Sequence, residues 1–156
     1  MALLRIGIIS DTHGLVRPEA LAYLKGCDAI IHAGDVCDPD VLLSLSALAP
    51  LTVVRGNNDW REWADQYAET ALVQFGGHWF YVIHDLMQLE IDPRTAGVSV
   101  VVSGHTHAPS VSKEDGVLFI NPGSAGPRRL SLPISIGEVW ITPDGCKGKT
   151  AVLNAK

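Results

Sequence analysis

The chain has 156 residues, a formal net charge of −5 at pH 7 and 47% hydrophobic residues. This length favours one domain over residues 1–156 with a sizeable core, and a charged content of 19% is too low for a disordered polyelectrolyte. The 12 Lys and Arg residues form no run, so no nucleic-acid-binding patch is evident.

The N-terminal segment and the cysteines bear on localisation. Residues 1–11 pass from a short apolar stretch into an aspartate without a small-residue cleavage site, which predicts a first strand and not a signal peptide. No apolar stretch approaches the ~20 residues that a bilayer-spanning helix needs. Cys27, Cys37 and Cys146 are odd in number and far apart, which indicates reduced thiols. We therefore expect a soluble, cytoplasmic protein without a membrane partner.

Five short apolar runs without alternation predict strands that are buried on both faces. Helices are predicted between the first three runs, over 17–26 and 38–50, because proline stands near each start and Gly26 or Pro50 at each end. This β-α-β-α-β order predicts right-handed crossovers and a parallel core. The five runs are 3–10, 28–34, 51–56, 79–84 and 98–104.

A third helix is predicted over residues 60–69. Asp59 would be its N-cap, and Glu62 would complete a capping box. Trp60 and Trp63 fall on this predicted surface helix, which indicates either a pocket wall or a subunit interface in a homo-oligomer.

The second half of the chain predicts antiparallel pairs. Gly76-Gly77 separates two apolar runs, a turn is expected at 113–116, and a last pair of strands follows within 133–154. We therefore predict an α/β sandwich of mixed, partly parallel sheets flanked by helices.

Polar residues able to bind a metal follow each of the five apolar runs. The carboxyl ends of strands form the ligand-binding edge of an open α/β sheet. In extended backbone, residues i and i+2 point to the same side, so we expect Asp11 with His13, and His105 with His107, to converge. The predicted metal ligands are Asp11, His13, Asp35, Asn57, His84, His105 and His107.

This set of ligands favours two cations. One zinc ion takes about four ligands, and imidazole, carboxylate and amide donors without thiolate suit Mn²⁺, the first choice here, or Fe²⁺, Zn²⁺, Ni²⁺ or Co²⁺. Asp35, central in chain order, is expected to bridge ions ~3.5–4 Å apart. Two carboxylates, two divalent cations and one bridging hydroxide leave a net charge of about +1, which attracts a phosphoryl group. Phosphoester hydrolysis by attack of that hydroxide is therefore predicted.

At these positions the chain resembles the calcineurin-like metallophosphoesterases. The resemblance is greatest to the small bacterial and archaeal phosphodiesterases, whose fold is shared with the retromer subunit Vps29. It implies a four-layer sandwich, one metal at Asp11, His13, Asp35 and His107, and another at Asp35, Asn57, His84 and His105. The motifs that carry the resemblance are DTH (11–13), GDVCD (34–38), GNND (56–59), GHTH (104–107) and NPGS (121–124).

Two departures from the family pattern stand at the substrate side. Many family members have histidine where Asn58 stands, in contact with the phosphate and able to protonate the leaving group. Asn58 can donate a hydrogen bond to the phosphate but is no acid near neutral pH, so we predict a preference for aryl esters, which leave unaided. Asp85 follows His84 where the family usually has glycine, which predicts an unusual rim.

Other polar residues have a structural interpretation. His32 lies inside an apolar run, Asp38 precedes a predicted helix as its cap, and Cys37 fits a small buried thiol. Arg128 and Arg129 either reach a phosphate or lie in an exposed loop. Residues 121–124 are expected to form a tight turn that supports the ligand loops.

The predicted function is a phosphodiesterase that acts on a small phosphoester. A phosphomonoesterase or a nucleotide pyrophosphohydrolase is the alternative enzyme. A non-catalytic scaffold of the Vps29 kind is the alternative from another class, and a complete set of metal ligands argues against it.

Overall fold

The computed structural model describes residues 3–154, and within that range the chain forms ten strands, two α-helices (α1 and α2) and two short 3-10 helices (η1 and η2). The helices are α1 (Pro18–Leu24), α2 (Pro39–Ser46), η1 (Glu62–Gln66) and η2 (Leu86–Gln88). The strands are β1 (Leu4–Ile9), β2 (Ala29–His32), β3 (Leu51–Val53), β4 (Thr70–Phe75), β5 (His78–Ile83), β6 (Val98–Val102), β7 (Ser110–Glu114), β8 (Val117–Asn121), β9 (Ser135–Thr142) and β10 (Gly145–Val152).

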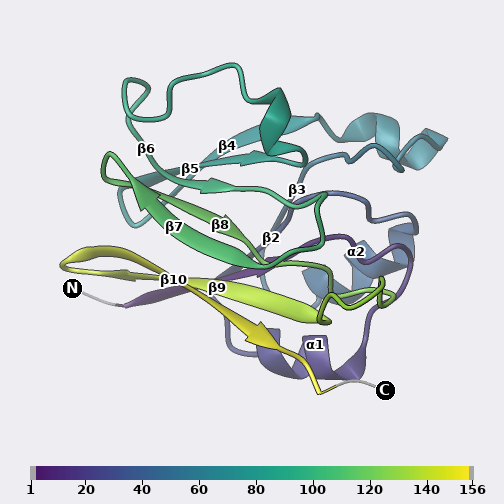
Figure 1. Cartoon of the computed structure of the whole chain (residues 1–156). Helices are drawn as coiled ribbons and strands as arrows, with labels where there is room; N and C mark the ends of the chain where they lie inside the picture. Colours follow the sequence, from purple (N-terminus) through teal and green to yellow (C-terminus); the bar gives the residue numbers. More distant parts are fainter. Residues whose placement is uncertain (1–2, 155–156) are drawn as a thin grey trace.

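The described strands build two five-stranded sheets that pack against each other (Figure 1). The first sheet has the order β10-β9-β1-β2-β3. Its strands β1, β2 and β3 run parallel to one another. The second has the order β4-β5-β6-β8-β7, with β5, β6 and β8 parallel. Both sheets are therefore mixed, which confirms the predicted α/β sandwich.

The helices cover the outer face of the first sheet. Leu24 of α1 and Leu45 of α2 are fully buried in one apolar cluster with Ile9 and Ile30 of the sheet. Pro39 starts α2, and the Asp38 side chain accepts a hydrogen bond from the Asp40 N–H at 2.9 Å, so Asp38 is the N-cap that the sequence predicts.

Glycine turns close the hairpins where the sequence predicts them. Gly76 and Gly77 both have positive φ and join β4 to β5, and Gly116 does the same between β7 and β8. Part of the outer face of the second sheet is covered by the segment 84–97, from which Ile91 packs on Val98 and Val101. This segment, with only the single turn η2, is the fourth layer of the sandwich.

The main core lies between the two sheets. Ile6 and Ile8 of β1 face Phe80, Val100 and related residues of the second sheet, and all of them are fully buried. Because Ile9 faces the helices instead, β1 is apolar on both faces, which explains its unbroken apolar run. Each such side chain contributes about 1.5–3 kcal/mol by burial.

The helix predicted over 60–69 is wrong in extent and in its cap. Only the 3-10 turn η1 forms there, and Arg61 is its N-cap without a side-chain hydrogen bond. Asp59 is 4% exposed and points into the protein instead of capping. Trp63 packs against the helix-side core, whereas Trp60 remains 75% exposed.

Neither the α-helices nor the 3-10 turns within residues 3–154 have the length and apolar character required to cross a bilayer. The three cysteines are free, with Cys27 and Cys146 buried and Cys37 half-buried, as the predicted thiols require.

Candidate metal centre

Parallel strands of both sheets end at one rim of the sandwich, and the loops after them carry the predicted ligands. Asp11 follows β1 and Asp35 follows β2, while His84 directly follows β5 of the other sheet. The loops after β1 and β2 stay paired beyond the strands, because Asp11 N–H donates to the Gly34 carbonyl and His13 N–H to the Asp35 carbonyl, both at 3.0 Å. The two sheets thus hold these side chains against each other.

The backbone is left-handed at five of the seven predicted ligands, including both i, i+2 pairs, so the expectation of extended backbone is wrong. Positive φ values occur at Asp11 (54°), His13 (47°), Asp35 (57°), His105 (71°) and His107 (65°). Non-glycine residues in this region cost of order 1–3 kcal/mol each, and such strain gathers at functional sites. In DTH and in GHTH every second residue is left-handed. The ligand side chains therefore point inward from loops and not from strands.

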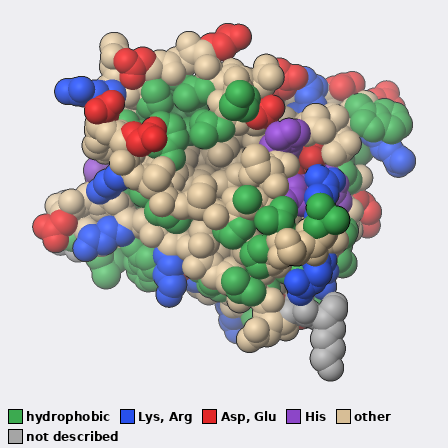
Figure 2. Space-filling view, in the orientation of Figure 1, with side chains coloured by type: hydrophobic (Ala, Val, Ile, Leu, Met, Phe, Trp, Pro, Cys, Tyr) green, Lys and Arg blue, Asp and Glu red, His purple; other side chains and the backbone are tan. Residues whose placement is uncertain are grey.

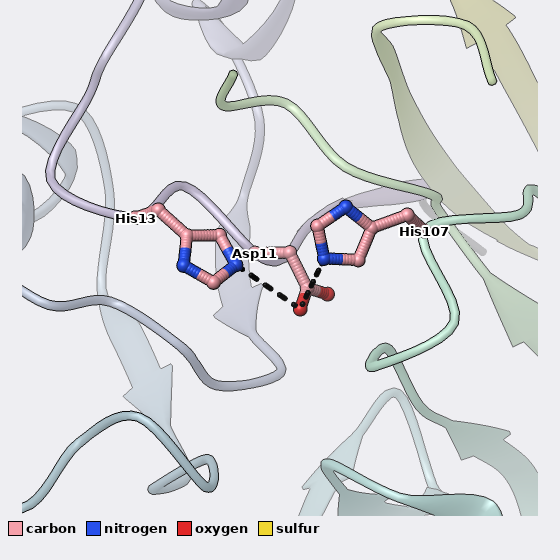
Figure 3. A group of neighbouring side chains, drawn as sticks. All are labelled: Asp11, His13 and His107. Carbon is pink, nitrogen blue, oxygen red and sulfur yellow. Dashed lines mark ion pairs between the residues drawn. The ribbon is translucent and has the colours of Figure 1, made fainter. Parts of the chain in front are cut away.

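Asp11, His13 and His107 form the first group (Figure 3). Asp11 Oδ1 lies 3.8 Å from His13 Nε2 and 3.4 Å from His107 Nε2, and both rings point at this oxygen. The two imidazole rings are 5.3 Å apart between centroids. The other Asp11 oxygen is occupied, because it accepts from the Ser10 hydroxyl at 2.6 Å and from the His105 N–H at 3.0 Å.

Asp11, Asp35 and His84 form the second group. His84 Nε2 lies 3.3 Å from Asp35 Oδ2 and 3.8 Å from Asp11 Oδ1, and Asp35 Oδ2 is also 3.7 Å from His13 Nε2. Both carboxylates therefore lie between the imidazoles of the two groups. The sequence singled out Asp35 for this central position, and the structure gives it to Asp11 as well.

The tautomer of His84 suits a metal ligand. Its Nδ1 lies 2.7 Å from the Ala33 carbonyl, which can only accept, so Nδ1 carries the proton and Nε2 keeps a free lone pair. Metal-binding histidines in proteins show this second hydrogen bond as a rule. His84 is thus well placed for the role that the sequence predicts for it.

Asn57 and His105 lie at the outer edge of the second group. His105 Nδ1 is 3.2 Å from Asn57 Oδ1, and the His105 ring lies 5.2 Å from the His84 ring. His105 and His107 do not converge on one point as expected. His105 belongs with His84, and His107 belongs with His13.

Burial and charge perturb the groups at the centre. Burial raises the pKa of Asp11, although the Ser10 hydroxyl acts in the other direction. Burial acts to raise the pKa of Asp35, but His84 and the donors of Asn58 outweigh it and hold the pKa well below its usual range. Burial acts to lower the pKa of His84, and the Asp35 and Asp11 carboxylates raise it in spite of that. Perturbed groups in such a cluster are typical of functional sites.

The donor set fits a divalent cation. Asp11 Oδ1, His13 Nε2 and His84 Nε2 are buried and have no hydrogen-bond partner within residues 3–154. Unpaired buried polar atoms are rare and costly in folded proteins. Two ligand atoms each about 2.0–2.2 Å from a shared ion lie roughly 3–4 Å apart, which is the spacing seen here. Imidazole and carboxylate donors without thiolate suit first-row divalent metals.

Three glycines permit the close approach of the ligand loops. A Cβ atom on Gly34 would lie 2.6 Å from His84 Nδ1, and one on Gly104 would lie 2.6 Å from Asp11 Oδ2. A Cβ on Gly56 would lie 2.3 Å from Asp35 Oδ1. Each distance is far below van der Waals contact, so the glycines directly before Asp35, Asn57 and His105 are needed for space.

Asp59 fixes the loops that carry Asp35 and Asn57. Its carboxylate accepts from the Cys37 N–H at 2.8 Å, the Gly56 N–H at 2.9 Å and the Val36 N–H at 3.1 Å. Sequence reasoning missed this role because the capping-box pattern gave Asp59 another explanation.

Replacing Asp59 with alanine is expected to lower the free energy of unfolding by about 2–3 kcal/mol, because three inward-facing N–H groups lose their acceptor. Chemical denaturation of the metal-free protein measures this. Glu62→Ala, an exposed carboxylate on η1, is the matched control and should change stability by less than about 0.5 kcal/mol. A loss no larger than that of the control would contradict the role.

Further buried polar residues support the ligand loops. His32 Nδ1 accepts from the Gly34 N–H at 3.1 Å, and its Nε2 lies 3.0 Å from the Thr12 hydroxyl. Burial lowers the pKa of His32 to about 3, so it is a neutral structural histidine, as predicted. Asn121 donates to the Gly104 carbonyl at 2.9 Å and Ser124 to the Asp11 carbonyl at 2.9 Å, so residues 121–124 support the ligand loops as predicted.

Asn58 and Cys37 contact the ligands. Both N–H groups of Asn58 donate to Asp35, the main chain to Oδ1 at 2.8 Å and the side chain to Oδ2 at 3.0 Å. The structure therefore turns the Asn58 amide toward a ligand. Cys37 Sγ is 3.7 Å from His13 Nδ1, and burial together with nearby carboxylates raises its pKa to about 11, which keeps it a thiol.

Comparison with known proteins agrees with this geometry. Residues 4–142 match the model of the calcineurin-like phosphoesterase superfamily domain. A probable metallophosphoesterase of Methanothermobacter thermautotrophicus is 35% identical over 140 residues, which cover 82% of this chain and 81% of the relative. A solved archaeal phosphodiesterase superposes with a TM-score of 0.79 at 27% identity, over 96% of this chain and 100% of that one.

The fold is also shared with a protein-sorting subunit. Vacuolar Protein Sorting 29 from Cryptosporidium parvum superposes with a TM-score of 0.75 at 18% identity, over 96% of this chain and 97% of that one. At this identity the likeness shows the fold alone. The match over residues 4–142, together with the relative at 35% identity, shows that the chain belongs to the calcineurin-like phosphoesterase superfamily.

Proposed function

We propose that this protein is a phosphodiesterase that depends on two divalent cations. The observation that carries the proposal is the buried oxygen Asp11 Oδ1, which has no hydrogen-bond partner in the described chain and faces three imidazole nitrogens at 3.4–3.8 Å. A divalent cation would satisfy this oxygen and the imidazole nitrogens around it together. The likeness to a solved archaeal phosphodiesterase at a TM-score of 0.79 supports the reaction class.

Two sets of ligands that share Asp35 would each hold one cation. Asp11, His13, Asp35 and His107 would bind the first, and Asp35, Asn57, His84 and His105 the second. When bound, the pair would supply a nucleophilic hydroxide at neutral pH and neutralise the phosphoryl oxygens. Mn²⁺ is our first choice, with Fe²⁺, Zn²⁺, Ni²⁺ and Co²⁺ compatible with the same donors. Free thiols at all three cysteines fit a cytoplasmic setting.

The protein's own residues order the ligands and bind the substrate. Ser10 and the His105 N–H fix one oxygen of Asp11 and leave the other for a cation. Asn58 holds both oxygens of Asp35, so it orients this carboxylate and does not supply a proton to the leaving group. Nothing at position 58 therefore assists a poor leaving group, and we propose that aryl esters are hydrolysed faster than alkyl esters.

The test is a screen of the purified protein with each divalent metal against aryl monoesters, aryl diesters and nucleoside polyphosphates. We expect the highest kcat/KM for an aryl diester. Preference for a monoester or for a pyrophosphate bond would identify the alternative enzymes. Metal binding without hydrolysis of any ester would contradict the proposal and favour a scaffold.

Replacing Asn58 with alanine should weaken metal binding by about tenfold, because an outer partner of a metal ligand typically contributes that much. Titration calorimetry with Mn²⁺ measures the change, and Gln66→Ala, an exposed amide on η1, is the matched control.

Asn58→His should restore a proton donor and raise the rate on alkyl esters relative to aryl esters. An unchanged ratio of alkyl to aryl activity would show that position 58 does not limit the leaving group.

A further inference from the structure

Two pockets open beside the candidate metal centre, one on each side. The first has a volume of about 450 Å³ and includes Arg55, Tyr81 and Glu90 in its wall, together with His84 and His105. We call it the Tyr81 pocket. Its size is within the range of pockets that hold small organic molecules.

The second pocket has a volume of about 460 Å³ and lies on the side of His13 and His107. Its remaining wall includes Arg128 and Arg129, and we call it the arginine pocket. Figure 2 shows histidine side chains at the surface, with a Lys or Arg side chain directly beside them and an Asp or Glu side chain nearby. The centre thus lies between two pockets that differ in charge.

The charges of the Tyr81 pocket are mainly negative. Arg55 faces Glu69 at 3.7 Å and Asp65 at 4.0 Å, so its charge is balanced by carboxylates of the chain itself. Asp85 faces His105 Nε2 at 3.8 Å, and Glu90 has no Lys or Arg partner in the wall. Counting one arginine against Glu69, Asp85 and Glu90, the wall has a formal charge of −2, whereas the arginine pocket has +2.

A buried, unpaired group connects the Tyr81 pocket to the reaction. His84 lines this pocket, is 4% exposed, and its Nε2 has no hydrogen-bond partner within residues 3–154. If the proposed function holds, the phosphoryl group binds to the cation that His84 holds. One ester arm of the substrate must then enter the adjoining Tyr81 pocket. The half-buried Tyr81 lines the same space, and an aromatic ring there suits a cationic arm.

We propose that the Tyr81 pocket binds a positively charged, ammonium-bearing alcohol arm of a phosphodiester. The inference rests on the proposed function and names its substrate class. The carboxylates attract the ammonium group and the tyrosine ring face favours it, while the arginine pocket repels it and so fixes the direction in which the diester lies. Water adds its oxygen to phosphorus, one P–O bond breaks, and the departing alcohol takes up the proton.

The experiment compares two chromogenic diesters that share a p-nitrophenyl leaving group. One is p-nitrophenyl phosphorylcholine, and the other is methyl p-nitrophenyl phosphate, which has no charge on its second arm. For the Mn²⁺-loaded protein we expect kcat/KM to be about tenfold higher for the choline ester. Glu90→Lys should lower this ratio by about tenfold, and Glu90→Gln by about threefold. Glu114→Lys, an exposed charge reversal on β7, should leave the ratio unchanged.

Binding measured separately distinguishes failure of this inference from failure of the proposed function. Titration calorimetry with phosphorylcholine and with methyl phosphate should show tighter binding of phosphorylcholine, and Glu90→Lys should remove the difference. Hydrolysis of both esters with no charge preference would overturn the inference and leave the phosphodiesterase intact. Tighter binding of phosphorylcholine with hydrolysis of neither ester would instead overturn the proposed function. Equal binding in all variants would overturn the assignment of the pocket.

Discussion

Replacing Asp35 with asparagine is expected to lower metal-dependent hydrolysis by on the order of a thousandfold, or about 4 kcal/mol in activation free energy. Asp35 Oδ2 lies 3.3 Å from His84 Nε2 and 3.7 Å from His13 Nε2, so it faces the ligands of both proposed cations. Asparagine keeps the shape but removes a negative charge and offers one oxygen in place of two. The loss of charge weakens both cation sites together.

The measurement is kcat/KM on an aryl diester at saturating Mn²⁺, together with the number of ions bound per chain. Asp40→Asn, an exposed carboxylate in the first turn of α2, is the matched control and should retain full activity. The melting temperature of metal-free Asp35→Asn should stay within a few degrees of the original protein. Retention of more than a tenth of the activity, with two ions still bound, would exclude Asp35 as the shared ligand.

Replacing Gly56 with alanine is expected to remove most activity although it adds only one methyl group. The new Cβ would lie 2.4 Å from the Asp35 backbone nitrogen and 2.3 Å from Asp35 Oδ1. A backbone atom cannot rotate away as a side chain can, so the loop after β2 must shift. A displacement of a catalytic group by about 1 Å can cost a hundredfold in rate. The variant should also be less stable by about 1–3 kcal/mol, as overpacked sites are.

Activity and thermal unfolding of Gly56→Ala should be compared with those of Gly148→Ala in β10. A Cβ at Gly148 would lie 3.2 Å from Leu118 Cδ2, which is the end of a flexible side chain. We expect this control to keep its activity and to lose less than about 1 kcal/mol. Full activity of Gly56→Ala would mean that the loops after β2 and β3 need not pack as closely as the structure has them.

The fold was predictable because the central strands of both sheets, such as β1 and β6, are covered on both faces. The run at 3–10 gave β1, and the run at 98–104 gave β6, since a buried strand carries no polar alternation. Gly76-Gly77 marked a hairpin that the structure contains. The segment 60–69 misled because its capping pattern is local, whereas two of the three N–H groups that bind the Asp59 carboxylate, those of Val36 and Cys37, belong to the loop after β2.

The sequence allowed the prediction that the metal ligands lie together at one rim. The prediction that extended backbone brings residues i and i+2 together was wrong. Strand order places Asp11, Asp35 and His84 at one rim, and the structure brings these three together. The i, i+2 argument assumed extended backbone, while Asp11 and His107 have left-handed φ. The left-handed Asp11, His13 and Asp35 lie in the loops after β1 and β2, which pair with each other, and no short-range pattern reveals such pairing.

The residues that support the ligands were the least visible in the sequence. The Ser10 hydroxyl and the side chain of Asn58 act through contacts with Asp11 and Asp35 that only the folded chain creates. The charge difference between the two pockets combines Glu90 with Arg129, which are far apart in sequence and flank the centre from different loops.

Anomalous diffraction from crystals grown with Mn²⁺, recorded on both sides of the manganese absorption edge, tests the metal centre most directly. We predict two peaks about 3.5–4 Å apart. One should lie among Asp11, His13 and His107, and the other among Asn57, His84 and His105, with Asp35 in contact with both. Peaks at other positions, or a single peak at full occupancy in crystals of active protein, would contradict the two-cation centre.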